Sequence, residues 1–243
     1  SRGVGGKGAA SAHYEAGKVV INLTKKHGKG SLGHEWWHAL DNYFSRMRGE
    51  KGGFISDRPN QYTVKGPDGG YVMDDRVRKE MLDAFKGVVT AINKSELPAR
   101  SMNRDGARSK VYWSTPLELT ARSFENFLIN KLGESGRRND YLANFKDTTQ
   151  WITDSNASLE DYPYPNAEES PEIDKAYQHF FDTIEEAEGE NGNVILRSIA
   201  ADRRNAIIEE FGLDPVSDKD VLDALEGAGV TLFSRSAPDT PAF

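Results

Sequence analysis

The sequence contains no cysteine, no long apolar run and no excess of positive charge. Without cysteine there is no disulfide framework, and a metal ion would have to be bound by histidine, aspartate or glutamate. No apolar run approaches the ~20 residues of a membrane-spanning helix, and no signal-peptide pattern is present. A formal net charge of −7 argues against a general nucleic-acid-binding protein. These absences exclude cysteine-based zinc sites and argue against a secreted or membrane-spanning protein.

The spacing of apolar and turn-forming residues predicts a mixture of helices and short strands. With 243 residues and 37% hydrophobic content, the chain can form one sizeable core and an appendage. A strand is expected at 18–24, a β-hairpin at 61–71, and helices at 31–48, 74–92, 115–132, 170–188, 193–211 and 217–227. The connections 95–109 and 133–170 are expected to be mainly irregular. We therefore expect an α+β core over residues 1–150, a helical appendage over 151–232 and a loose tail over 233–243.

Residues 34–38 form the pattern His-Glu-x-x-His, which is rare in a chain of this length. Because an α-helix has 3.6 residues per turn, His34 and His38 lie on one face and can present imidazole nitrogens to one metal ion. Glu35 would then lie beside the metal, where a glutamate can act as a general base toward water. The pentapeptide predicts a catalytic metal-binding helix, and the alternative is a surface helix that carries these residues by chance.

The residues around the pentapeptide fit a helix that lines a cleft. An apolar stripe occupies one face, and its members are Trp36, Leu40, Tyr43, Phe44 and Met47. Asp41 lies with the two histidines on another face, so its carboxylate could bond the far nitrogen of an imidazole and fix its tautomer. Its alternative role is that of an exposed helix acid. The other three histidines, which are His13, His27 and His179, are expected to be surface or structural residues.

A catalytic zinc site has three protein ligands and one open position, so a third ligand is needed outside the pentapeptide. The helix expected at 115–132 offers Glu118 and, two turns later on the same face, Glu125. Zinc peptidases of the gluzincin type use a glutamate on a second helix, followed three residues later by a small residue, and Glu118 with Ala121 resembles that arrangement. However, Thr115 and Glu118 also fit a capping box, in which the Glu118 side chain would bond to the helix terminus instead.

Two further side chains near this helix could act on a reacting carbonyl group. The phenol of Tyr112 could donate a hydrogen bond to a developing oxyanion, although a Tyr-Trp pair before a helix often packs in the core. Arg122 lies one turn after Glu118 and could serve the same purpose or pair with Glu125. Both residues are therefore secondary catalytic candidates.

The segments Gly-Ser-Leu-Gly-His-Glu-Trp-Trp-His-Ala-Leu-Asp at 30–41 and Tyr-Trp-Ser-Thr-Pro-Leu-Glu-Leu-Thr-Ala-Arg-Ser-Phe-Glu at 112–125 occur in this order. Together they resemble large polyvalent protein-associated domain 1, a zincin-like family of long multidomain proteins in phages, prophages and conjugative elements. The resemblance covers about residues 10–132. It implies that Zn²⁺ is bound by His34, His38 and Glu118 and that Glu35 is the catalytic acid and base. The second glutamate of the family pattern falls on Glu125.

The residues and the resemblance together predict a zincin-like α+β zinc metalloendopeptidase that acts on a polypeptide. Its expected setting is the cytoplasm of a bacterial host or a phage particle, with no membrane partner and no strong nucleic-acid partner. Two alternatives stay open. The protein could be a metal-binding interaction or anti-defence module without turnover, or a peptidase that acts on a host protein.

Repeated residues at the ends of the chain suggest a substrate. The chain begins with Ser1-Arg2 and ends with Phe243, and Phe233-Ser234-Arg235 combines these signatures. This pattern predicts that the enzyme cuts its own polyprotein between Phe and Ser, with an apolar subsite for Phe. A second copy at 44–46 is expected to be helical and therefore spared, because proteases bind extended substrates along a strand edge such as 18–24. The alternative is that the tripeptide recurs by chance.

Overall fold

The computed structural model describes residues 12–23, 29–49, 52–61, 63–65, 68–73, 77–106, 108–153, 158–188 and 194–198. Within this part of the chain the α-helices are α1 (Leu32–Met47), α2 (Lys79–Lys94), α3 (Leu97–Asp105), α4 (Pro116–Glu134), α5 (Thr148–Thr153) and α6 (Ser170–Phe181). Short 3-10 helices are η1 (Ile55–Asp57) and η2 (Leu159–Asp161). The strands form three antiparallel hairpins, β1 (Ala12–Glu15) with β2 (Val20–Leu23), β3 (Thr63–Lys65) with β4 (Tyr71–Met73), and β5 (Ile184–Glu188) with β6 (Val194–Ser198). The protein is therefore α+β, as expected.

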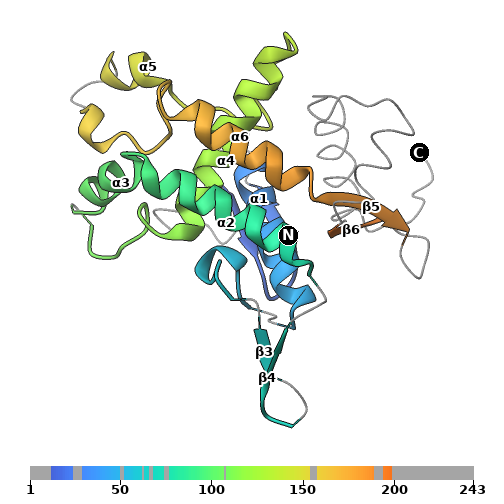
Figure 1. The fold of residues 1–243 in the computed structure, drawn as a ribbon. Coiled ribbons are helices and arrows are strands. Elements are labelled where there is room, and N and C mark those ends of the chain that lie inside the picture. Colours follow the sequence, from blue (N-terminus) through green and yellow to red (C-terminus); the bar gives the residue numbers. More distant parts are fainter. Residues whose placement is uncertain are drawn as a thin grey trace, which may run out of the picture.

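The helices form the body of the molecule and the hairpins lie at its periphery. Helix α1 packs against α4, and α2 packs against both α4 and α6. Figure 1 shows α2 and α6 running side by side in front of α1 and α4, while the β3–β4 hairpin extends away from the helices. The β1–β2 hairpin contacts α1. Among the described helices, none is both long and apolar enough to cross a lipid bilayer.

A cluster of aromatic side chains forms the core, with Trp37 at its centre. Trp37 is fully buried and stacks on Phe124 of α4 and Phe85 of α2, with ring centroids 4.9 and 5.6 Å apart. Tyr177 of α6 meets the same indole edge-on at 5.0 Å. Offset and edge-to-face contacts of this kind add to the free energy of burial. The aromatic pair inside the His-Glu-x-x-His pattern therefore ties α1 to three other helices and fixes the position of its histidines.

The first turn of α1 approaches α4 closely because it contains glycine. A Cβ atom built on Gly33 would lie 2.6 Å from the Leu128 side chain and 3.1 Å from the carbonyl oxygen of Leu142. The Gly33 amide donates to that same carbonyl at 2.7 Å. On the opposite helix, Ala121 is fully buried. Small residues at both positions thus allow α1 and α4 to pack closely together.

Several expected elements differ from the structure. Residues 97–105, expected as part of an irregular connection, form α3, and β1 forms at 12–15, where no strand was expected. The helix expected to reach residue 188 ends at Phe181, after which 184–188 pairs as a strand with 194–198. Most of the expected helix at 193–211, and all of that at 217–227, lies outside the described residues.

The hydrophobic core extends beyond residue 150, where a separate helical appendage was expected to begin. Ile173, Tyr177 and Phe180 of α6 belong to the same buried cluster as Trp37 and Phe124. Leu196 of β6 joins this cluster, and its carbonyl oxygen accepts a hydrogen bond from the Tyr43 hydroxyl at 2.8 Å. Helix α6 therefore contributes to the core that supports α1 and α4.

Candidate metal centre

His34, His38 and Glu118 converge where α1 crosses α4. One potential ligand atom from each residue lies within 4.8 Å of the others. The Nε2 atom of His34 is 3.3 Å from Oε2 of Glu118, and the Nε2 atom of His38 is 3.6 Å from Oε1 of the same carboxylate. The two imidazole rings meet nearly at right angles, with centroids 4.7 Å apart. The histidine spacing and the candidate third ligand thus come together from helices that are far apart in the sequence.

The donor set fits a transition metal ion such as Zn²⁺. Two imidazole nitrogens and one carboxylate are a common ligand set of catalytic zinc, which keeps its fourth position for water or substrate. His38 and Glu118 are each 7% exposed, so these donors are largely withdrawn from solvent. Within the described part of the chain, no other three such side chains converge in this way.

The charges of the site favour a cation at its centre. Burial alone would lower the pKa of His34, but the carboxylates of Glu125 and Glu118 outweigh it and raise that pKa to about 10. Burial, together with the neighbouring His34, lowers the pKa of His38 to about 4 despite the Glu118 carboxylate. Burial would raise the pKa of Glu118, but both imidazoles bring it well below its ordinary value. The site therefore holds an ionised Glu118 carboxylate, a neutral His38 and a protonated His34, which would release a proton when it binds a metal ion.

The backbone and the side chain of Glu118 make different contacts, and this difference decides between the capping role and the ligand role. Thr115 is the N-cap of α4, and its hydroxyl accepts a hydrogen bond from the backbone amide of Glu118 at 3.3 Å. The amide of Thr115 donates to the carbonyl oxygen of Tyr112. The Glu118 carboxylate instead contacts the two imidazoles and Arg122. Glu118 therefore takes part in the cap through its backbone, while its side chain reaches the candidate metal centre.

Glu125 contacts the far side of one candidate ligand. Its Oε2 atom lies 3.1 Å from Nδ1 of His34, and its side chain is 5% exposed. A carboxylate at Nδ1 holds the proton there and leaves Nε2 available for a metal ion. This geometry is that of a group that orients His34. It differs from the role of third metal ligand, for which the sequence also offered Glu125.

Arg122 is buried and its guanidinium group is engaged by protein acceptors. It donates from Nη1 to Oε2 of Glu118 at 3.2 Å, and from Nε to the carbonyl oxygen of Pro163 at 3.0 Å. A further Nη2 hydrogen bond goes to the carbonyl oxygen of Trp113. These contacts show that Arg122 holds the Glu118 carboxylate in place. The sequence left open a pair with Glu125, but the ion pair in the structure is with Glu118.

Glu35 lies beside the cluster in a largely buried position, 6% exposed. Burial raises its pKa to about 7, although the charge of His34 and a hydrogen bond from the Tyr14 amide both oppose that shift. A carboxyl group with a pKa near neutrality can both accept and donate a proton under physiological conditions. The amide contact also shows that β1 is the strand next to Glu35.

Tyr112 points into the same site from the loop before α4. Burial and the Glu118 carboxylate, to which its phenol hydrogen-bonds, raise the pKa of Tyr112 well above its ordinary value, with a smaller contribution from Glu35. The residue as a whole is 40% exposed. Tyr112 is therefore not packed in the core, which was the alternative to a catalytic role. Its hydroxyl remains a hydrogen-bond donor at neutral pH.

Asp41 contacts the 3-10 helix η1 and not a histidine. Its Oδ1 atom accepts a hydrogen bond from the Ser56 amide at 3.0 Å, and η1 supplies the other groups that lower its pKa. Burial, the dominant effect, raises that pKa to about 7. Among the described residues, Nδ1 of His38 has no hydrogen-bond partner. Asp41 is thus neither exposed nor bonded to an imidazole, and it anchors η1 to α1.

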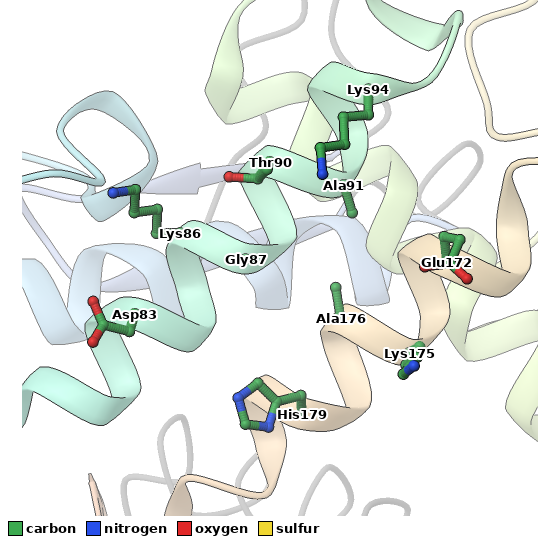
Figure 2. A pocket seen from close by; sticks show the side chains of 10 residues that line it. All are labelled: Asp83, Lys86, Gly87, Thr90, Ala91, Lys94, Glu172, Lys175, Ala176 and His179. Atoms are coloured by element: carbon green, nitrogen blue, oxygen red, sulfur yellow. The ribbon is translucent and has the colours of Figure 1, made fainter.

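The remaining histidines lie away from the cluster. His13 of β1 faces Asn22 of β2 at 3.3 Å, and His27 lies outside the described residues. His179 lines a surface groove of about 420 Å³ between α2 and α6, shown in Figure 2. That groove contains none of the candidate catalytic or ligand residues. These positions agree with the expected surface or structural roles of His13 and His179.

The structure describes only one of the two Phe-Ser-Arg segments. Residues 44–46 lie inside α1, where Phe44 and Ser45 are buried, so this copy is helical as expected. Phe233, Ser234 and Arg235 lie outside the described residues.

Comparison with known families adds one match. Residues 104–188 match the family model of large polyvalent protein-associated domain 1. The matched segment includes α4 with Glu118 and Glu125 and continues through α6, whereas the resemblance noted from the sequence ended near residue 132. The match does not include the His-Glu-x-x-His helix. No curated protein and no solved structure is significantly similar to the chain.

Proposed function

We propose that the protein is a zinc-dependent endopeptidase whose metal is bound by His34, His38 and Glu118. The observation that carries the proposal is the position of Glu35, a buried carboxyl group with a pKa near neutrality, beside a three-ligand cluster. A purely structural metal site has no need of a general base. The zincin-like fold is part of the same proposal, supported by two ligands on one helix and the third on another.

The chain's own residues supply the proton transfers of peptide hydrolysis. When bound, zinc would polarise the scissile carbonyl group and make water acidic enough to react at neutral pH. Glu35 accepts the proton of the attacking water and later donates it to the leaving amine. The Tyr112 hydroxyl donates a hydrogen bond to the oxyanion as the carbonyl carbon becomes tetrahedral and keeps its own proton. Arg122 holds the Glu118 carboxylate and takes no direct part.

The substrate binds as an extended strand beside β1. Peptidases commonly add a substrate strand to a sheet edge, because main-chain hydrogen bonds give affinity independent of sequence. The sequence alone favoured the strand at 18–24, but Tyr14 of β1 is the residue whose amide contacts Glu35. We therefore assign the substrate-binding edge to β1, which pairs with β2 on its other side.

The proposed substrate is a polyvalent polyprotein, cut between Phe and Ser in a Phe-Ser-Arg sequence. A peptide of residues 228–240 contains Phe233-Ser234-Arg235 and tests this specificity. The zinc-loaded protein should cut it once, after Phe233, and should leave a matched peptide with Phe233→Asp intact. Equal cleavage of both peptides would refute the specificity while leaving the peptidase activity in place.

The activity itself is tested with a generic unfolded protein substrate and the Glu35→Gln variant. Both proteins should bind one equivalent of zinc, but hydrolysis should fall at least 1,000-fold in the variant, since it cannot accept a proton. Full zinc occupancy without hydrolysis in the unmodified protein would instead identify a metal-binding interaction module.

A further inference from the structure

A single carboxylate organises the loop that leads into α4. Asp105, the last residue of α3, accepts hydrogen bonds from the backbone amides of Tyr112, Trp113 and Ser114, at 3.0, 2.9 and 2.8 Å. The Ser114 hydroxyl makes a fourth, at 2.7 Å. Oδ1 receives two of these bonds and Oδ2 the other two. Hydrogen bonds to an ionised acceptor are stronger than neutral ones, so this is a firm anchor.

The same loop is tied to α4 through its carbonyl groups. The hydroxyl of Thr115 donates to the carbonyl oxygen of Tyr112 at 2.9 Å, and Arg122 donates to that of Trp113. The Trp113 ring also lies under two guanidinium groups, those of Arg104 at 4.3 Å and Arg122 at 4.6 Å. Both backbone polar groups of Tyr112 are therefore fixed, one by α3 and the other by the helix that carries Glu118.

This anchoring has a direct consequence for the position of the Tyr112 phenol. Fixing the backbone of a residue costs conformational entropy, which a partly exposed loop does not recover by apolar burial. The neighbouring Val111 is 68% exposed, so packing does not hold this end of the loop. The hydrogen bonds to Asp105 replace that packing and keep the phenol at the Glu118 carboxylate.

We propose that Asp105 is a positioning residue, which holds Tyr112 beside Glu118 and Glu35 for the hydrolysis of a peptide bond. This inference rests on the proposed function. Asp105 acts through the backbone of residues 112–114 and does not touch the substrate. Burial opposes ionisation of Asp105, but its four hydrogen bonds lower the pKa to about 2, so the anchor persists over the physiological pH range.

The experiment is a double-mutant cycle with Asp105→Asn, Tyr112→Phe and the combination. Asparagine has the same shape as aspartate but replaces one acceptor oxygen with a donor, so it loses two of the four hydrogen bonds. Loss of one oxyanion donor typically lowers kcat about 100- to 1,000-fold, which is expected for Tyr112→Phe. Asp105→Asn should lower kcat by a similar or smaller factor and leave KM within about threefold. The combined variant should be no slower than Tyr112→Phe alone.

Two controls separate positioning from general loss of structure. Asp147 accepts a hydrogen bond from the Gln150 amide at 2.8 Å in the first turn of α5, so Asp147→Asn makes the same chemical change at another amide-accepting carboxylate and should leave kcat unchanged. Amide hydrogen exchange gives a readout independent of activity. In Asp105→Asn the amides of residues 112–114 should exchange faster, while zinc affinity and the exchange of α1 stay as in the unmodified protein.

The outcomes are distinguishable from failure of the proposed function. If Asp105→Asn lowers kcat as much in the Tyr112→Phe background as in the unmodified protein, Asp105 does not act through Tyr112 and this inference is wrong. Unchanged amide exchange at 112–114 would also overturn it. If the unmodified zinc-loaded protein hydrolyses no peptide bond, the proposed function fails, and this inference fails with it.

Discussion

Replacing Glu125 with glutamine should weaken zinc binding without removing a ligand. In the structure Oε2 of Glu125 faces Nδ1 of His34 at 3.1 Å, and the carboxylate is almost entirely shielded from water. The amide of glutamine can present either an acceptor or a donor to Nδ1, so it no longer forces the tautomer with Nε2 free. Loss of such an orienting group typically lowers metal affinity about 10- to 100-fold, which corresponds to about 1.4–2.7 kcal/mol.

The assay is competition for zinc with a chromogenic chelator at fixed pH. Glu118→Gln serves as the reference for loss of a direct ligand and should weaken binding more than Glu125→Gln does. Asp174→Asn is a matched control, because Asp174 is a shielded carboxylate that accepts a hydrogen bond from Asn130 at 2.7 Å, away from the site. Its zinc affinity should equal that of the unmodified protein.

Two results would contradict an orienting role of Glu125. If Glu125→Gln binds zinc within threefold of the unmodified protein, the contact with His34 has no orienting effect. If Glu125→Gln loses as much affinity as Glu118→Gln, or more, Glu125 is itself a ligand, and the metal lies between α1 and the second of the two candidate glutamates.

Two predictions concern stability and are measured by chemical denaturation. Gly33→Ala should destabilise the protein by about 1–3 kcal/mol, because the new Cβ would meet Leu128 and Leu142. The control is Gly87→Ala in α2, whose Cβ meets nothing within 4 Å and which should stabilise the protein by about 0.5–1 kcal/mol. Stabilisation by both substitutions would contradict the close approach of α1 and α4. The pKa of Asp41 is about 7 in the folded chain against about 3.9 when unfolded, so the folded state binds the extra proton between these values and stability falls as pH rises from 4 to 7. Without metal, Asp41→Asn should reduce that slope by up to about 1.4 kcal/mol per pH unit, and unchanged slopes in the two proteins would contradict a buried, protonated Asp41.

Local sequence patterns were enough to predict the two helices that carry the candidate site. The four-residue spacing of His34 and His38 on a helix with an apolar stripe was enough to predict α1, which ends before Gly49 as expected. The Thr-Pro pair before Glu118 correctly marked the start of α4. These features depend on helix geometry and capping, which act over a few residues, so a single sequence is sufficient to find them.

The roles of Glu125 and Asp105 and the strand at 184–188 depend on tertiary contacts, which the sequence alone does not show. Glu125 and His34 are 91 residues apart, and no local pattern distinguishes an orienting carboxylate from a ligand. Asp105 lies in a polar stretch that was expected to be irregular, since Asn, Asp and Gly are common in turns and loops. The segment Ile-Glu-Glu-Ala-Glu at 184–188 contains helix-forming residues, yet pairing with 194–198 makes it a strand.

The metal centre itself is tested most directly by anomalous X-ray diffraction at the zinc absorption edge, from crystals of the zinc-loaded protein. We expect one strong peak between Nε2 of His34, Nε2 of His38 and the carboxylate of Glu118, at about 2.0–2.2 Å from each. A peak bound by other residues, or none at this position under saturating zinc, would contradict it.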